Sequence, residues 1–147
     1  MTHSEPHTVA AAIETTIVSD IHEMFGRYGP AFVDLAVGTR SDMDALLDFY
    51  GAPLRFIGPS FHLVMMDNAA ILGPDGMGGE IDRLRKAHFA ASSLERCDVS
   101  VLNNRAALVD ALWLRRDARG ALLARFAVTY LVTLTAEGWR ITSAVNT

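Results

Sequence analysis

The stretch Phe126–Thr147, FAVTYLVTLTAEGWRITSAVNT, decides the fold of this chain. Hydrophobic and polar residues alternate along its first part, as they do in a half-buried β-strand. The segment Thr135–Gly138 then marks a tight turn, and a second extended run leads to Asn146. This part of the sequence therefore predicts a long β-hairpin.

Further elements are predicted upstream of this hairpin. Turn residues separate extended runs at 54–58, 61–67, 96–102, 105–116, 122–135 and 139–146. Apolar residues at helical spacing predict helices over 8–25, 31–38, 42–50 and 80–92, with a break or kink at Gly26–Pro30, an N-cap at Ser41 and a loop at Gly73–Gly79. Helices and strands are segregated along the chain, which favours an α+β fold over a parallel βαβ design.

This order of elements resembles the NTF2-like superfamily, the cone-shaped fold of nuclear transport factor 2, ketosteroid isomerase and the SnoaL-type cyclases. The resemblance covers almost the whole chain by element order, and in sequence it lies in Phe126–Ala144, with an aromatic residue in mid-strand and Gly138-Trp139 after the turn. It implies a single domain over 1–147, in which N-terminal helices pack on a strongly curved mixed or antiparallel sheet. Residues 1–7 are polar and are expected to be a frayed tail.

Composition limits the classes of function. Charged residues make up 20% of the chain, below the roughly 25% of typical globular proteins, and this shortfall predicts that a partner covers apolar surface. The net charge of −4 and the scattered basic residues argue against nucleic-acid binding. The single Cys97 excludes an intrachain disulfide, and no apolar run approaches the roughly 18 residues of a membrane span, so we expect a cytoplasmic protein. The five histidines lack ligand spacing, so neither a metal nor a cofactor is predicted.

Two turns predict which side chains lie beneath the helices. A type I turn with a glycine bulge at Asp117–Gly120 would pair Asp117 with Ala121, and a two-residue turn at Asn103-Asn104 would pair Leu102 with Arg105. Both counts place one set of side chains on the helix-covered face: Cys97, Val99, Val101, Leu108, Asp110, Leu112, Phe126, Val128, Tyr130, Val132 and Leu134. A slip of one residue would exchange the two faces.

Asp110 is the only acid on this predicted inner face. A buried carboxylate either finds a partner or takes up a proton with a raised pKa, so Asp110 is a candidate general acid or base, with Tyr130 as a hydrogen-bond donor; the alternative is a purely structural role. A bulged turn at Thr135–Gly138 would place Asn146 beside Val128, whereas a two-residue turn would place Val145 there. The expected pocket lining is Tyr50, His62, Cys97, Leu108, Leu112, Phe126, Val128 and Asn146.

The opposite, convex face of the predicted sheet carries Val109, Trp113, Arg125 and Leu131. NTF2-like proteins commonly pair through this face, so a homodimer is expected there. The sequence contains no diagnostic catalytic motif. It favours a protein of uncertain function that binds a small hydrophobic molecule, and the alternatives are a lyase, isomerase or hydrolase working by acid–base catalysis and a non-catalytic dimerisation module.

Overall fold

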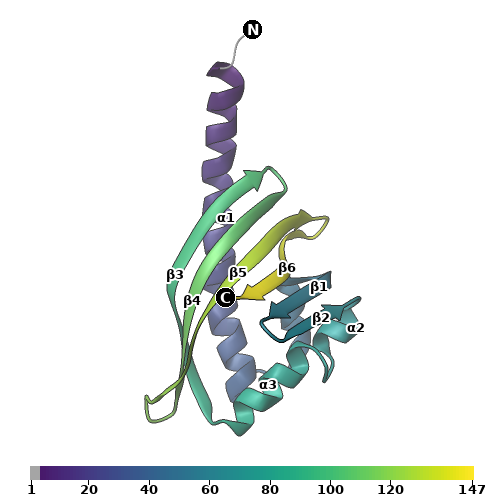
Figure 1. Cartoon of the computed structure of the whole chain (residues 1–147), viewed down its shortest axis with the longest axis vertical. Coiled ribbons are helices and arrows are strands. Elements are labelled where there is room, and N and C mark those ends of the chain that lie inside the picture. The colour runs from purple at the N-terminus through teal and green to yellow at the C-terminus, as the bar shows by residue number, and fades with distance from the viewer. Residues whose placement is uncertain (1–3) are drawn as a thin grey trace.

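The computed structural model describes residues 4–147, with side chains from Ala11 onward. Its elements are α1 (Ser4–Val37), the 3-10 helix η1 (Met43–Asp48), β1 (Tyr50–Gly58), β2 (Phe61–Met65), α2 (Asn68–Leu72), α3 (Met77–Lys86), β3 (Phe89–Asn103), β4 (Ala106–Asp117), β5 (Leu122–Thr135) and β6 (Gly138–Asn146). The strands form one six-stranded sheet in the order β2-β1-β6-β5-β4-β3, in which β1 and β6 are parallel and the other neighbours are antiparallel. The sheet curves along the long helix α1, and α3 lies near the C-terminal end of α1 (Figure 1). The predicted α+β arrangement is confirmed.

Helix α1 is continuous through Gly26–Pro30, so the predicted break there is wrong. Proline inside a helix removes one backbone hydrogen bond. The helix is nevertheless held on both sides of Pro30, because Phe25, Tyr28 and Phe32 are buried against the sheet. The helix begins at Ser4, four residues before the predicted start at Thr8, and the part of the expected frayed tail at residues 1–3 lies outside the described residues.

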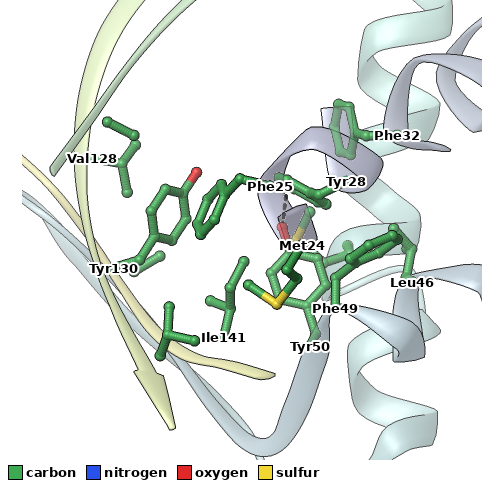
Figure 2. Packing of buried hydrophobic residues seen from close by; sticks show 14 of the residues in the cluster. Met24, Phe25, Tyr28, Phe32, Leu46, Phe49, Tyr50, Val128, Tyr130 and Ile141 are labelled. Atoms are coloured by element: carbon green, nitrogen blue, oxygen red, sulfur yellow. Dashed lines mark hydrogen bonds between the residues drawn. The ribbon is translucent and has the colours of Figure 1, made fainter. Parts of the chain in front are cut away.

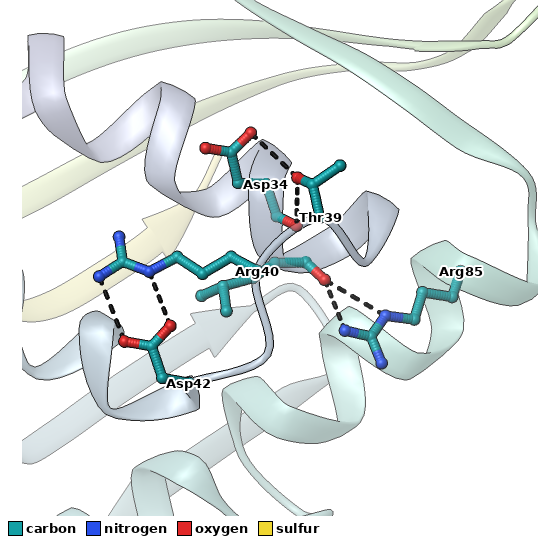
Figure 3. A network of polar contacts seen from close by, with 6 residues as sticks. Asp34, Thr39, Arg40, Asp42 and Arg85 are labelled. Carbon is teal, nitrogen blue, oxygen red and sulfur yellow. Dashed lines mark hydrogen bonds and ion pairs between the residues drawn. The ribbon is translucent and has the colours of Figure 1, made fainter.

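The end of α1 is fixed by α3. Arg85 donates from Nε and Nη2 to the carbonyl oxygen of Leu35 at 3.2 and 2.7 Å (Figure 3). This carbonyl lies in the last turn of α1, where oxygens lack helical partners and a cation meets the negative end of the helix dipole. In the loop that follows, Arg40 pairs with Asp42. The bonds from Arg85 thus join α3 to the C-terminal end of α1.

The segment predicted as a helix over 42–50 is shorter than expected. It forms the 3-10 helix η1, whose N-cap is Asp42 rather than Ser41, and Tyr50 already belongs to β1. As a result, the Tyr50 side chain reaches the core from a strand. The core between α1 and the sheet is rich in aromatic rings, and the ring of Tyr28 packs against those of Phe49, Tyr50 and Trp113 (Figure 2 shows Tyr28, Phe49 and Tyr50).

The predicted turn at Asp117–Gly120 is confirmed, but the register beyond it is not. Gly120 has a φ of 81°, and the Asp117 amide donates to the Ala121 carbonyl at 3.0 Å. Arg116 then pairs with Leu122, whereas Arg115 pairs with Ala124, so Leu123 is an extra residue. This bulge shifts the pairing by one residue and exchanges the faces of β4 relative to the prediction.

Only in β4 do the inward and outward faces differ from the prediction. Val109 and Trp113 are buried beneath the helices, while Asp110 is exposed on the convex side. In β5, Phe126, Val128 and Tyr130 face inward as predicted, and in β3 the predicted inward residues Cys97, Val99 and Val101 pack against the core.

The last hairpin has the turn of one predicted alternative and the Asn146 position of the other, because a second bulge lies between them. The turn is of the two-residue kind, because Thr135 pairs with Gly138, and this register continues to the pair Val132–Ile141. Leu131 then pairs with Ser143, which leaves Thr142 as an extra residue. Asn146 therefore lies opposite Val128, the position expected for the bulged turn.

Candidate functional site

A cavity of about 710 Å³ lies between the helices and the concave face of the sheet. Its volume falls within the range of roughly 300–1,000 Å³ that is common for small-molecule sites. Its lining is largely apolar and aromatic and includes a few charged groups. The lining residues are Tyr28, Tyr50, Phe56, Phe61, Leu63, Pro74, Asp75, Gly76, Met77, Glu80, Arg83, Arg115, Ala124, Phe126, Val128, Tyr130, Ala144 and Asn146.

All three tyrosines of the chain line this cavity. The hydroxyls of Tyr28 and Tyr50 are hydrogen-bonded to each other (Figure 2), and Trp113 Nε1 donates to Tyr130 Oη at 2.9 Å. Burial raises the pKa of Tyr28 to about 12, against the opposing effect of its bond to Tyr50. Burial likewise raises the pKa of Tyr50 and of Tyr130 well above the ordinary value. These phenols therefore stay protonated at neutral pH and act as hydrogen-bond donors rather than as bases.

Arg115 forms the charged part of the site. Its guanidinium lies 5.5 Å from the ring centroid of Phe32 and 4.6 Å from that of Phe126, and its Nη1 donates to Glu80 Oε1 at 2.9 Å. Arg83 Nη2 donates to the other oxygen of Glu80 at 2.8 Å. Burial by itself would raise the pKa of Glu80, but the hydrogen bond from Arg83 and the charge of Arg115 together lower it. Glu80 is therefore ionised and is a weak proton acceptor.

Five residues predicted for the site do line the cavity, namely Tyr50, Phe126, Val128, Tyr130 and Asn146. Three of them, Phe126, Val128 and Tyr130, were predicted from the alternation of inward and outward residues along β5. Cys97 faces inward on β3 and is half-buried, but it lies outside the cavity lining.

The other predicted residues lie elsewhere. Asp110 is exposed on the convex side, where it accepts a hydrogen bond from Thr129 Oγ1 at 2.7 Å, so its predicted inward position is wrong. Leu108 and Leu112 share that convex side because the Leu123 bulge reverses β4. His62 is exposed on β2 and contacts Arg55 Nη1 at 3.2 Å, outside the cavity.

The predicted dimer surface is also rearranged. Val109 is fully buried and Trp113 is 5% exposed, so neither belongs to the convex face and that part of the prediction is wrong. Arg125 and Leu131 pair with Leu114 and Leu108 of β4 and remain on the convex face.

Sequence reasoning missed Glu80 and Arg115. A signal for Arg115 exists in the alternation of β4, because a residue two positions after an inward Trp113 also points inward. Glu80 carries the spacing of a helical ion pair with Arg83, but no local pattern indicates that it reaches β4.

Two properties concern the whole described part of the chain. Between residues 4 and 147, no helix has both the length and the apolar character needed to cross a membrane. Nor do His, Cys, Asp or Glu side chains, where described, form a group of three or more that could hold a metal ion.

A helix-backed, curved mixed sheet around an apolar cavity defines a cone-fold protein of the NTF2 type. The family model described as NTF2-like protein (DUF6841) matches residues 19–147, and the chain belongs to this family. No curated protein matches the sequence.

Solved structures with the same fold include several NTF2-like proteins. An NTF2-like protein with a cystatin-like fold from Novosphingobium aromaticivorans is 22% identical, with a TM-score of 0.70, over 94% of this chain and 86% of that one. An NTF2-like superfamily protein from Salmonella enterica serovar Typhimurium is 19% identical, with a TM-score of 0.64, over 91% and 92% of the two chains. An NTF2-like protein of unknown function from Shewanella oneidensis is 17% identical, with a TM-score of 0.62, over 88% and 97%. At these identities the likeness concerns the fold.

Proposed function

We propose that this chain binds a small, largely hydrophobic molecule in the cavity between its helices and the concave sheet face. The observation that supports this function is a space of about 710 Å³ whose apolar lining is interrupted by three tyrosines. The apolar walls would bury the body of the ligand, and the protonated hydroxyls would orient it. A cytoplasmic setting, expected from the single Cys97, is part of this proposal.

The same lining favours binding over acid–base catalysis. Glu80 is held by two arginines with a lowered pKa, and Asp110 lies on the opposite side of the sheet. Asp75, the other carboxylate of the lining, is exposed to solvent, and no histidine is among the described residues that line the cavity. A proton-abstracting enzyme needs a base of suitable pKa within reach of its substrate. Tyr130 keeps its predicted role as a hydrogen-bond donor, now toward a bound ligand.

Filling the cavity tests this function. Ala124 lines it on β5, and replacing Ala124 with tryptophan would place an indole where the ligand body should lie. We expect the wild-type protein to bind N-phenyl-1-naphthylamine with a rise in its fluorescence, and Ala124→Trp to weaken that binding at least about tenfold, since even 1.4 kcal/mol of lost contact has this effect. Fluorescence titration measures both affinities.

Ala121→Trp provides the matched control. It adds the same indole to an exposed position three residues earlier, outside the cavity. Its affinity should equal that of the wild type. Equal affinities in all three proteins would show that the dye binds elsewhere and would count against the cavity.

We also propose that two copies of this chain pair through the convex face of the sheet. The face carries an apolar patch beside the exposed Asp110 and Arg125, because the Leu123 bulge turns leucines of β4 outward. Its half-buried apolar residues are Ile57, Leu108, Leu112, Leu114, Ala127, Leu131 and Val145. A second copy would present the same patch, as a two-fold interface requires.

A charge in this patch should separate the two copies. We expect Leu112→Glu to raise the dissociation constant of the dimer at least about tenfold, because pairing would bury two unpartnered carboxylates. Sedimentation equilibrium measures the constant. Ser19→Glu, at an exposed site on α1 on the other side of the sheet, should leave it unchanged. A wild-type protein that remains monomeric at high concentration would rule out the interface.

A further inference from the structure

A second, smaller chamber adjoins the large cavity. It has a volume of about 30 Å³, which is room for one or two water-sized atoms. Its walls are Tyr28, Gly29, Phe32, Ser92, Trp113, Arg115, Phe126 and Tyr130, and four of these also line the large cavity: Tyr28, Arg115, Phe126 and Tyr130. The chamber therefore extends the proposed binding site toward α1 and β3.

Arg115 brings unused donors to this chamber. A guanidinium carries five N–H donors, and the hydrogen bonds among the described residues use Arg115 through Nη1 alone. The side chain of Arg115 is only 18% exposed, so the bulk solvent has little access to its remaining donors. The flanking rings of Phe32 and Phe126 hold the guanidinium in place.

Tyr130 adds a neutral donor to the same chamber. Its oxygen already accepts a hydrogen bond from Trp113, and among the described residues its own hydrogen has no recorded acceptor. Since burial keeps this phenol protonated, the hydrogen is available to a ligand oxygen. Arg115 and Tyr130 thus offer hydrogen-bond donors from two adjacent strands, β4 and β5.

The charge balance supports an anion at this end of the site. Arg115 is the one charged side chain among the walls of the small chamber, all of them described residues. Glu80 lines only the large cavity, and it is shared between Arg83 and Arg115, so it offsets one of two positive charges. Asp75 lines the large cavity and is absent from the chamber walls.

We propose that the small chamber is a carboxylate subsite, in which Arg115 and Tyr130 hold the acid group of the ligand. The inference rests on the proposed binding function and makes it more specific. The ligand is an amphipathic carboxylic acid whose aromatic or alicyclic body would lie in the large cavity. Arginine matches a carboxylate through two parallel N–H···O bonds, and a tyrosine O–H can donate to the same group.

A matched pair of probes tests the subsite. 2-Naphthoate and 2-naphthamide have nearly the same shape, and only the former is charged. By isothermal titration calorimetry at neutral pH, the wild-type protein should bind 2-naphthoate at least about tenfold more tightly than 2-naphthamide. Arg115→Met should remove this preference and leave the affinity for 2-naphthamide within about threefold.

Two further variants complete the design. Arg116→Met removes the neighbouring arginine, which is exposed and lies outside both cavities, and it should keep the wild-type preference. Glu80→Gln removes the carboxylate that competes for Arg115 and should tighten 2-naphthoate binding about threefold or more, and by a larger factor than 2-naphthamide binding. If circular dichroism shows that Arg115→Met does not fold, the Glu80→Gln variant tests the subsite in its place.

The outcomes separate the two proposals. If the wild type binds both probes equally, or if Arg115→Met folds and keeps the preference, the carboxylate subsite is rejected and the apolar cavity stands. If Arg115→Met does not fold and Glu80→Gln leaves 2-naphthoate binding unchanged, the subsite is rejected as well. If the wild type binds neither probe, both the cavity function and the subsite are rejected.

Discussion

Replacing Trp113 with alanine is expected to lower the free energy of unfolding by about 3–5 kcal/mol, the usual effect of deleting a large buried aromatic side chain. The indole is 5% exposed beneath α1, and its ring lies 5.9 Å from that of Tyr28. Its loss would leave a cavity in the aromatic core and remove the hydrogen bond to Tyr130. Urea unfolding followed by circular dichroism measures the change.

Asp110→Asn is the companion experiment. Asp110 is exposed three residues before Trp113, and its recorded partner is the Thr129 hydroxyl, which an asparagine oxygen can also accept from. Its substitution should change the unfolding free energy by no more than about 0.5 kcal/mol. A large effect at Asp110 and a small one at Trp113 would instead support the register that the turns alone predict.

Gly79→Ala is expected to lower the unfolding free energy by about 3 kcal/mol, toward the upper end of what overpacking produces. Gly79 is buried at the start of α3, and a Cβ atom there would overlap the carbonyl oxygen of Pro74. Because the obstacle is backbone, the segment that lines the cavity at Pro74–Met77 would have to move. Thermal or urea unfolding measures the change in stability.

Gly26→Ala is the matched substitution in open space. Gly26 is exposed within α1, and an added Cβ would meet no atom within 4 Å. Alanine favours a helix over glycine by about 0.8–1.0 kcal/mol, so this variant should be more stable than the wild type. If both glycine substitutions stabilised the protein, the close approach at Gly79 would be wrong.

Local chemistry predicted the turn at Asp117–Gly120 and the inward residues of β5. It placed the β3–β4 turn one residue too early, because Asn103 pairs with Ala106, and it could not predict the bulges. Asp117–Gly120 carries a turn signal, whereas Leu122-Leu123 reads as uninterrupted apolar strand. Strand β4 is apolar on both faces, with Leu108 and Leu112 on one side and Val109 and Trp113 on the other, so its alternation does not distinguish them. The burial of the indole against α1 decides the choice, and this contact joins residues distant in sequence.

The sequence likewise predicted the part of the site that lies on one strand but not the part that joins two distant elements. Tyr130, Phe126 and Val128 follow from the alternation of a single strand. Glu80 of α3 and Arg115 of β4 lie 35 positions apart along the chain and meet only in the folded protein. No spacing rule spans that separation, so the charged end of the site needed the three-dimensional structure.

The place of β6 in the sheet has a consequence for how the protein matures during translation. β6 lies between β1 and β5, and 138 − 58 = 80 positions separate the end of β1 from the start of β6. The β1–β2 ribbon, which carries Tyr50 and Phe56, therefore has no sheet neighbour until β6 leaves the ribosome. Domains dominated by such distant pairings assemble late. A nascent chain stalled before β6 should accordingly expose Tyr50 and Phe56, two walls of its future ligand site, to chaperones.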